Sequence, residues 1–186
     1  MLEVGGLKGV AIDGAALWNM QRMLGIAELN YRSFVGCLKK IGNNVPFVQR
    51  PRSSIHPKLC KTGVRLYDDM RRAGILPRAA TSCNEDDDRL VIKWGSRYIC
   101  KNNVSDIVLV TCDAEIIDTL LELLEYRQAR DKDCPNVHVL GTCLPDTDGA
   151  CPFCMDLLAE LRKNPATTFH DLESIKNAIM SKRVVH

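Results

Sequence analysis

Short apolar runs alternate with stretches of helical periodicity along the whole chain. The runs predict buried strands at residues 9–12, 45–48, 107–111 and 137–140. A shorter strand is expected at residues 75–76, where Pro77 limits its length. The polar, Pro-containing segment 49–57 predicts a loop.

Apolar residues recur every three or four positions in six further stretches, and this spacing predicts helices. Gly42 and Gly74 are natural stops for two of them, and Asn84 followed by four acidic residues is a typical helix start. The predicted helices cover residues 17–41, 59–73, 84–100, 115–129, 152–163 and 169–182.

Apolar strands separated by helices indicate a parallel sheet that is covered on both faces. We therefore predict the α/β class, as a doubly wound three-layer α/β/α domain with a mostly parallel central sheet and right-handed crossovers. The length of 186 residues suits a single domain over 1–186. Its core is expected at residues 8–140, followed by a helical, Cys-rich C-terminal extension at 141–186.

Composition adds little to the prediction of the fold, but the net charge bears on which partners the chain can bind. Hydrophobic residues make up 46% of the chain and the net charge is only +2, so a nucleic-acid-binding surface would have to come from local clustering. Basic residues cluster between residues 50 and 78, and a solvated helix face is the alternative interpretation. Aromatic residues make up 5%, which does not indicate a base-stacking platform. The predicted phosphate contacts come from Arg50, Arg52, Lys58, Lys61 and Arg65, expected after the second strand at the carboxyl end of the sheet.

The chain contains no run of 18 apolar residues, so we expect no membrane-spanning helix. Its first residues lack the pattern of a secretory signal, and nine cysteines are an odd number for a disulfide framework. We expect an intracellular protein, cytoplasmic or nuclear. The sequence is compatible with a homodimer.

Acidic residues follow the two clearest strands. Asp13 comes directly after residues 9–12, and Asp113 follows residues 107–111. The carboxyl ends of parallel strands meet at one edge, where ligands bind in doubly wound sheets. Carboxylates that converge there repel each other, and an oxygen-only ligand set favours Mg²⁺ or Mn²⁺. An acid after a strand is also a common helix N-cap, and the run 85–88 is also typical of a solvated helix start.

Two motifs resemble the NYN domain family, also called LabA-like. Residues 10–17 resemble its opening motif, an apolar strand followed by Asp-Gly-x-Asn-Leu, and residues 111–116 resemble its Ser-Gly-Asp-x-Asp-Phe. The resemblance covers residues 8–140 and implies a PIN-like fold with metal-dependent ribonuclease activity, in which metal ions activate water for attack on a phosphodiester. Asp87 is the alternative to Asp88 in the metal-binding set, because the run of acidic residues leaves the register ambiguous. The implied metal-binding and catalytic residues are Asp13, Asp88, Asp113 and Glu115.

Three positions depart from the family pattern. Ala16 replaces the motif Asn, Cys112 replaces the motif Gly, and Glu115 replaces the second acid. The alternative is therefore a catalytically degenerate NYN-fold module that acts as an RNA- or protein-binding adaptor. A phosphatase of the haloacid dehalogenase type is disfavoured because no Asp-x-Asp follows the first strand, and a dinucleotide-binding fold because no Gly-x-Gly-x-x-Gly does.

Four cysteines crowd into the region that follows residue 133, with His138 between them. A Cys-x-x-Cys pair at residues 151–154 suits a structural zinc site, and free or partly buried thiols are the alternative. His56 and His170 are expected at the surface. The predicted zinc ligands are Cys134, Cys143, Cys151 and Cys154.

Overall fold

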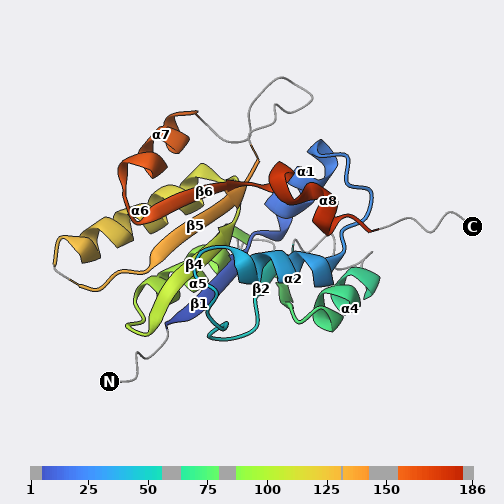
Figure 1. Ribbon diagram of the computed structural model, residues 1–186, viewed down its shortest axis with the longest axis horizontal. Helices are drawn as coiled ribbons and strands as arrows, with labels where there is room; N and C mark the ends of the chain where they lie inside the picture. Colours follow the sequence, from blue (N-terminus) through green and yellow to red (C-terminus); the bar gives the residue numbers. More distant parts are fainter. Residues whose placement is uncertain (1–5, 56–63, 80–86, 131, 143–154, 182–186) are drawn as a thin grey trace, which may run out of the picture.

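The protein is a three-layer α/β/α sandwich, consistent with a PIN-like fold (Figure 1). We describe it from a computed structural model, whose described residues are 6–55, 64–79, 87–130, 132–142 and 155–181. The predicted α/β class and three-layer architecture are confirmed.

The central layer is a six-stranded sheet with the order β3-β2-β1-β4-β5-β6. All neighbouring strands are parallel. Chain order reverses between β1 and β4, because the chain first builds β2 and β3 on one side and then crosses to β4. The strands are β1 (Leu7–Ile12), β2 (Arg52–Ile55), β3 (Leu76–Ala79), β4 (Val104–Val110), β5 (Asn136–Gly141) and β6 (Thr167–Asp171).

Helices cover both faces of this sheet. One face carries α1, α2, α4, η1 and α8, and the opposite face carries α5, α6 and α7. The helices are α1 (Gly14–Met23), α2 (Tyr31–Lys40), α4 (Val64–Arg72), α5 (Asp87–Ile99), α6 (Ala114–Gln128), α7 (Met155–Lys163), η1 (Leu172–Ile175) and α8 (Lys176–Ile179). None of the helices within the described ranges is long and apolar enough to cross a membrane.

Alternate residues of each central strand supply the two cores. Val10 and Ile12 of β1 pack among the helices around α2, whereas Ala11 between them packs against the α5 side. β4 behaves in the same way, with Val108 and Val110 on one face and Leu109 on the other. Because both faces are buried, residues 9–12 of β1 and 107–110 of β4 are continuously apolar, as the sequence pattern predicted.

The single helix predicted at residues 17–41 is wrong. The structure has two helices there, α1 and α2, separated by a turn at Gly25. Gly25 has a φ of 65°, a left-handed conformation that glycine adopts without steric cost. Asn30 then caps α2 by accepting the backbone N–H of Ser33 at 3.0 Å. Both helices keep the predicted apolar spacing, which is why the pattern did not reveal the break.

The predicted second strand is also misplaced. Residues 45–48 make only an isolated parallel bridge, between Lys8 and Phe47, and the strand that joins the sheet is β2 at Arg52–Ile55. The sequence predicted a loop there because Arg52, Ser53 and Ser54 are polar. Ser53 and Ser54 are nevertheless fully buried. The hydroxyl of Ser53 donates to the neighbouring carbonyl of Ser54, and the hydroxyl of Ser54 accepts the N–H of Gly14 on α1.

The helix predicted at residues 169–182 is wrong as well. Residues 167–171 form β6, which pairs with β5 and extends the sheet, and only the short η1 and α8 follow. Part of the C-terminal segment therefore belongs to the same sheet as the core. The helices predicted at 115–129 and 152–163 and the strands predicted at 107–111 and 137–140 are confirmed within a few residues. Asn84 lies outside the described residues.

Candidate functional site

Asp13 and Asp113 lie at the carboxyl ends of neighbouring parallel strands. β1 pairs with β4 in a register that places Ile12 beside Val110, and each acid follows shortly after its strand. This pair of strands is also where the chain order reverses, which is the usual ligand-binding position in a doubly wound sheet. The predicted convergence of these two acids is confirmed.

Asp13 is nearly buried and is held by three hydrogen bonds. Its Oδ1 accepts the backbone N–H groups of Ala15 and Ala16, each at 3.0 Å, and so caps α1. Its Oδ2 accepts the hydroxyl of Thr111 at 3.1 Å. Burial raises the pKa of Asp13, against these hydrogen bonds, and the nearby charge of Asp113 adds to the rise.

Thr111 connects the two acids. While its hydroxyl donates to Asp13, the same oxygen accepts the backbone N–H of Asp113 at 3.1 Å. Thr111 is fully buried. Sequence reasoning did not assign it a role, although it stands at the Ser position of the second motif.

Asp113 caps α6 in the way that Asp13 caps α1. Its Oδ1 accepts the N–H groups of Glu115 at 2.8 Å and Ile116 at 3.2 Å. Asp113 is half-buried, whereas Glu115 is exposed in the first turn of the helix. Two helix amino termini therefore point their backbone dipoles at this end of the sheet, which favours negative charge there.

Gly14 lets α1 start against β2. Its N–H donates to the hydroxyl of Ser54 at 3.1 Å. A Cβ at Gly14 would lie 2.0 Å from the carbonyl oxygen of Ser54, so a larger residue would push α1 or β2 away. The Asp-Gly pair that opens the first motif thus combines a helix cap with a close approach between two elements.

The third predicted acid lies on α5. This helix connects parallel strands β3 and β4, so it runs against the strands and begins at their carboxyl end. It packs against β1, β2, β4 and α6. Asp88 lies in its first turn and is half-buried, while the side chain of Asp87 lies outside the described residues.

The structure brings together two of the four predicted metal ligands. Within the described ranges, no three His, Cys, Asp or Glu side chains lie close enough to each other to hold a metal ion. Asp88 and Glu115 therefore flank the pair of Asp13 and Asp113 without joining it in a three-carboxylate group. The pair itself has the right chemistry for Mg²⁺ or Mn²⁺, because it offers oxygen donors whose mutual repulsion a cation would relieve.

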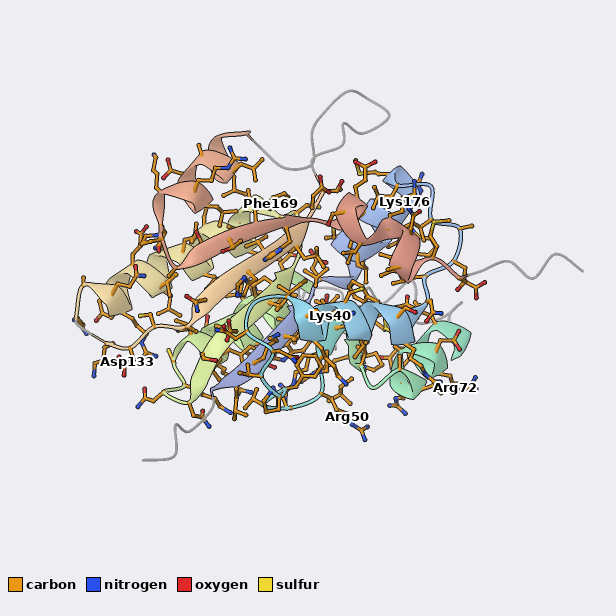
Figure 2. The ribbon with its side chains drawn as sticks, viewed as in Figure 1. Lys40, Arg50, Arg72, Asp133, Phe169 and Lys176 are labelled. Atoms are coloured by element: carbon orange, nitrogen blue, oxygen red, sulfur yellow. The ribbon has the colours of Figure 1, made fainter. Side chains whose placement is uncertain are left out.

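The predicted basic surface is placed differently from our expectation. Because β2 begins at Arg52, Arg50 and Arg52 lie before or at the start of the strand and not after it. Arg52 is half-buried, with Cζ 5.8 Å from the centre of the Trp94 ring and Nη2 donating to Gln49 at 3.0 Å. Arg50 is exposed and extends away from the body of the domain (Figure 2).

The other predicted RNA contacts cannot be placed in the same detail. Lys58 and Lys61 lie outside the described residues, and Arg65 lies in the first turn of α4 with its side chain outside them. Their contacts to RNA stay predictions.

Of the predicted zinc ligands, only Cys134 falls within the described residues. It is half-buried and its thiol lies 3.9 Å from the carbonyl oxygen of Leu124. Cys143, Cys151 and Cys154 lie outside the described residues, so the zinc site stays a prediction.

The histidine predicted at the surface is half-buried. Nε2 of His170 lies 3.2 Å from Nδ1 of His138, and Nε2 of His138 lies 3.2 Å from Oδ1 of the buried Asp106. Asp106 and His138 lie inside β4 and β5, whereas His170 is in register with Leu140 near the carboxyl end of the sheet, on a strand two places away from β4. His56 lies outside the described residues.

Comparisons with known proteins support the fold alone. No protein-family model matches the chain, and no curated protein matches it. A crystal structure of a protein of unknown function from Vibrio parahaemolyticus RIMD 2210633 is similar, with a TM-score of 0.55 and 14% sequence identity. The match covers 92% of this chain and 96% of that chain, so the whole architecture recurs there. At this identity the likeness carries no function.

Proposed function

We propose that this chain is a divalent-metal-dependent ribonuclease that cuts RNA phosphodiester bonds at the carboxyl ends of β1 and β4. The observation that carries the proposal is the pairing of Asp13 and Asp113 at the point where strand order reverses. The resemblance of residues 10–17 and 111–116 to the two NYN motifs points to RNA as the substrate.

The two carboxylates are held in fixed positions before any substrate arrives. Asp13 is fixed by Ala15, Ala16 and Thr111, and Asp113 by its own cap on α6. Rigid oxygen donors need little reorganisation when charge develops nearby. In this proposal Asp13 and Asp113 hold Mg²⁺ or Mn²⁺, and Asp88 and Glu115 approach from the first turns of α5 and α6. A bound cation would supply water activation and neutralise charge on the phosphate.

The test is cleavage of labelled single-stranded RNA in Mg²⁺, in Mn²⁺ and in EDTA. We expect cleavage with either metal and none in EDTA. Asp113→Asn should reduce cleavage to background, because the variant removes a charged oxygen donor and keeps the helix cap. Asp133→Asn is the matched control, since Asp133 is exposed near the amino end of β5, away from this site (Figure 2). Equal cleavage by the parent and Asp113→Asn would refute the proposal.

One group of observations favours a second function, a catalytically degenerate module that binds RNA or a protein. Both carboxylate oxygens of Asp13 already accept hydrogen bonds from the protein, and Ala16 replaces the motif Asn. No third candidate ligand joins the pair among the described residues. RNA binding by anisotropy, without cleavage in Mn²⁺, is the result expected for this adaptor.

A further inference from the structure

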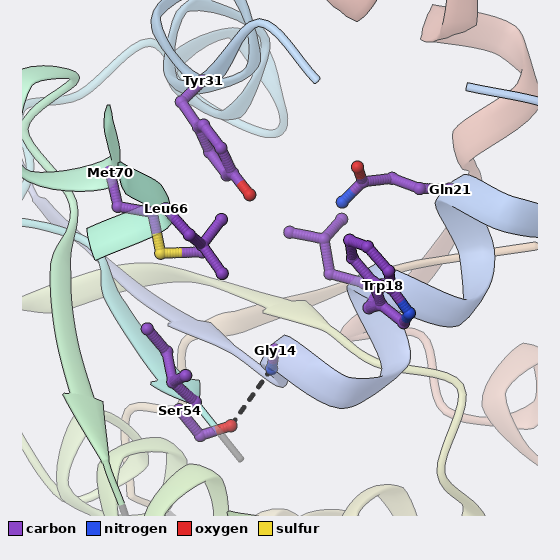
Figure 3. A pocket seen from close by; sticks show the side chains of 9 residues that line it. Gly14, Trp18, Gln21, Tyr31, Ser54, Leu66 and Met70 are labelled. Atoms are coloured by element: carbon purple, nitrogen blue, oxygen red, sulfur yellow. Dashed lines mark hydrogen bonds between the residues drawn. The ribbon is translucent and has the colours of Figure 1, made fainter. Parts of the chain in front are cut away.

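A small hollow lies between α1, α2, α4 and the end of β2 (Figure 3). Its free volume is about 10 Å³, roughly the room that one water molecule needs. Gly14, the residue after Asp13, forms part of its wall, so the hollow begins one residue away from a candidate ligand. The lining residues that the argument uses are Gly14, Trp18, Gln21, Tyr31 and Ser54.

Trp18 stands at this hollow with 46% of its surface exposed. The other tryptophan, Trp94, is 1% exposed in the core, which is the usual place for a large apolar ring. The few aromatic residues of this chain do not form an extended platform, but one indole lies next to the candidate site. Trp18 is five residues after Asp13, which is about 7.5 Å along a helix axis.

The polar ends of Gln21 and Tyr31 come from different helices, α1 and α2, and point toward each other at this hollow (Figure 3). Burial raises the pKa of Tyr31 to about 12, so its hydroxyl stays protonated at neutral pH. Gln21 is 7% exposed, so this polar pair is part of the packing beneath Trp18 and is not a surface for a ligand.

A positive charge lies on the same side of α1. Arg22 is exposed and is four residues after Trp18, so both project from one face of the helix. On the helix that follows Asp13 the structure thus offers an exposed indole face and a guanidinium. This combination matches a nucleotide, whose base stacks and whose phosphate is negative.

We propose that Trp18 stacks on a nucleobase of single-stranded RNA next to the phosphodiester held at Asp13 and Asp113. Arg22, which is exposed on the same face of α1, contacts a neighbouring phosphate. This proposal rests on the proposed function for its substrate, but it concerns binding and does not require cleavage.

The test measures binding of single-stranded RNA in EDTA, using the full chain. RNA should quench the fluorescence of the parent, and the quenching should disappear in Trp18→Phe, where buried Trp94 is the remaining tryptophan. Trp18→Ala should weaken binding by about 5- to 150-fold, the range typical for loss of one stacked base. An abasic strand of the same length should bind the parent and Trp18→Ala equally.

Tyr126→Ala is the matched control, because Tyr126 is 54% exposed near the far end of α6. It should bind RNA as the parent does. Unchanged affinity in Trp18→Ala, an equal loss on the abasic strand, or no RNA binding by the parent would each overturn the proposal. If Trp18→Ala does not fold, the quenching experiment on the parent and Trp18→Phe still decides it. RNA binding that depends on Trp18 without cleavage in Mn²⁺ would refute the nuclease and leave this inference standing.

Discussion

The hydroxyl of Thr111 lies 3.1 Å from Oδ2 of Asp13, so a residue that follows β4 fixes the acid that follows β1. The same oxygen accepts the N–H of Asp113 at 3.1 Å. One buried hydroxyl therefore sets the relative position of both candidate ligands. Such a group stabilises the fold and also prepares the site, because it is bonded on both sides before any ligand binds.

Replacing Thr111 by Val should destabilise the protein. Val has nearly the same shape, but it leaves Oδ2 of Asp13 and the N–H of Asp113 without their partner. A hydrogen bond to a charged group contributes roughly 1.5–3 kcal/mol, so we expect a loss of that order in urea denaturation. Thr111→Ser keeps the hydroxyl and should lose much less. Equal losses in the two variants would show that packing, and not the hydroxyl, matters here.

Asp113→Asn and Asp113→Ala should separate capping from charge. Asn accepts the N–H groups of Glu115 and Ile116 as Asp does, and it removes the charge that opposes ionisation of Asp13. We expect Asp113→Asn to be as stable as the parent or slightly more stable. Asp113→Ala should lose about 0.5–2 kcal/mol in thermal or urea unfolding. A strongly destabilised Asn variant would contradict this assignment.

Gly14→Ala should destabilise the domain and disturb the site. The new Cβ would lie 2.0 Å from the backbone oxygen of Ser54, and backbone cannot move aside as a flexible side chain can. Overpacking of this kind costs about 1–3 kcal/mol. Gly36→Ala is the control, because Gly36 lies inside α2 with nothing within 4 Å of its Cβ position. That variant should gain about 0.5–1 kcal/mol, so unfolding midpoints of the two should move in opposite directions.

The sequence predicted the site better than it predicted the edges of the sheet. Residues 107–110 of β4 are apolar because both faces of the strand are covered, and Asp113 follows in a motif, so strand and acid could both be recognised. β2 could not be recognised, since its serines are polar and the partner of the Ser54 hydroxyl, the N–H of Gly14, is brought there only by the tertiary structure. β6 is half-buried at the sheet edge, and its polar residues obscured the pattern.

The same distinction holds within the site. The caps formed by Asp13 and Asp113 are local and can be read from a strand that ends in Asp. The exposure of Trp18 depends on how α1, α2 and α4 pack around it, which no local pattern contains. The position of Arg52 after the second strand was mispredicted for the same reason, because its partner Trp94 is distant in sequence.

Arg50 and Arg52 should respond differently to alanine substitution. Arg52→Ala removes the contact with the Trp94 ring and the hydrogen bond to Gln49, so it should lower stability by roughly 1–2 kcal/mol. Arg50→Ala should leave stability unchanged. If Arg50 contacts a phosphate, the log–log salt slope of RNA binding should become shallower by about 0.7, measured by anisotropy in EDTA. An unchanged slope would mean that Arg50 is only a solvated side chain.

A row of polar residues crosses the sheet from β1 to β6 and runs diagonally toward its carboxyl end. Lys8 and Asp106 are paired in register on β1 and β4, and both are fully buried. Nζ of Lys8 donates to carbonyl oxygens at the end of α2, including that of Lys39 at 2.8 Å. Burial alone would raise the pKa of Asp106, but hydrogen bonds from Ser105, Asn43 and His138 bring it below its usual value. Asp106 is thus ionised at neutral pH, and the row continues through His138 to His170.

Stability should fall as the pH drops below about 6.5, and His170 should contribute to the fall. Burial lowers the pKa of His170 from 6.5, and the neighbouring His138 lowers it further. The unfolded chain therefore takes up the proton first, so the stability contributed by neutral His170 is present above pH 6.5 and is lost as the pH falls towards the folded pKa. The limit for one proton is about 1.4 kcal/mol per pH unit. The lowered pKa of Asp106 acts only below 3.8, so Asp106 does not contribute between pH 7 and 5. His170→Gln keeps an N–H donor for His138 but does not titrate. Its unfolding free energy, measured in urea from pH 7.5 to 5, should depend less steeply on pH than that of the parent, and parallel curves would exclude His170 as a source of the slope.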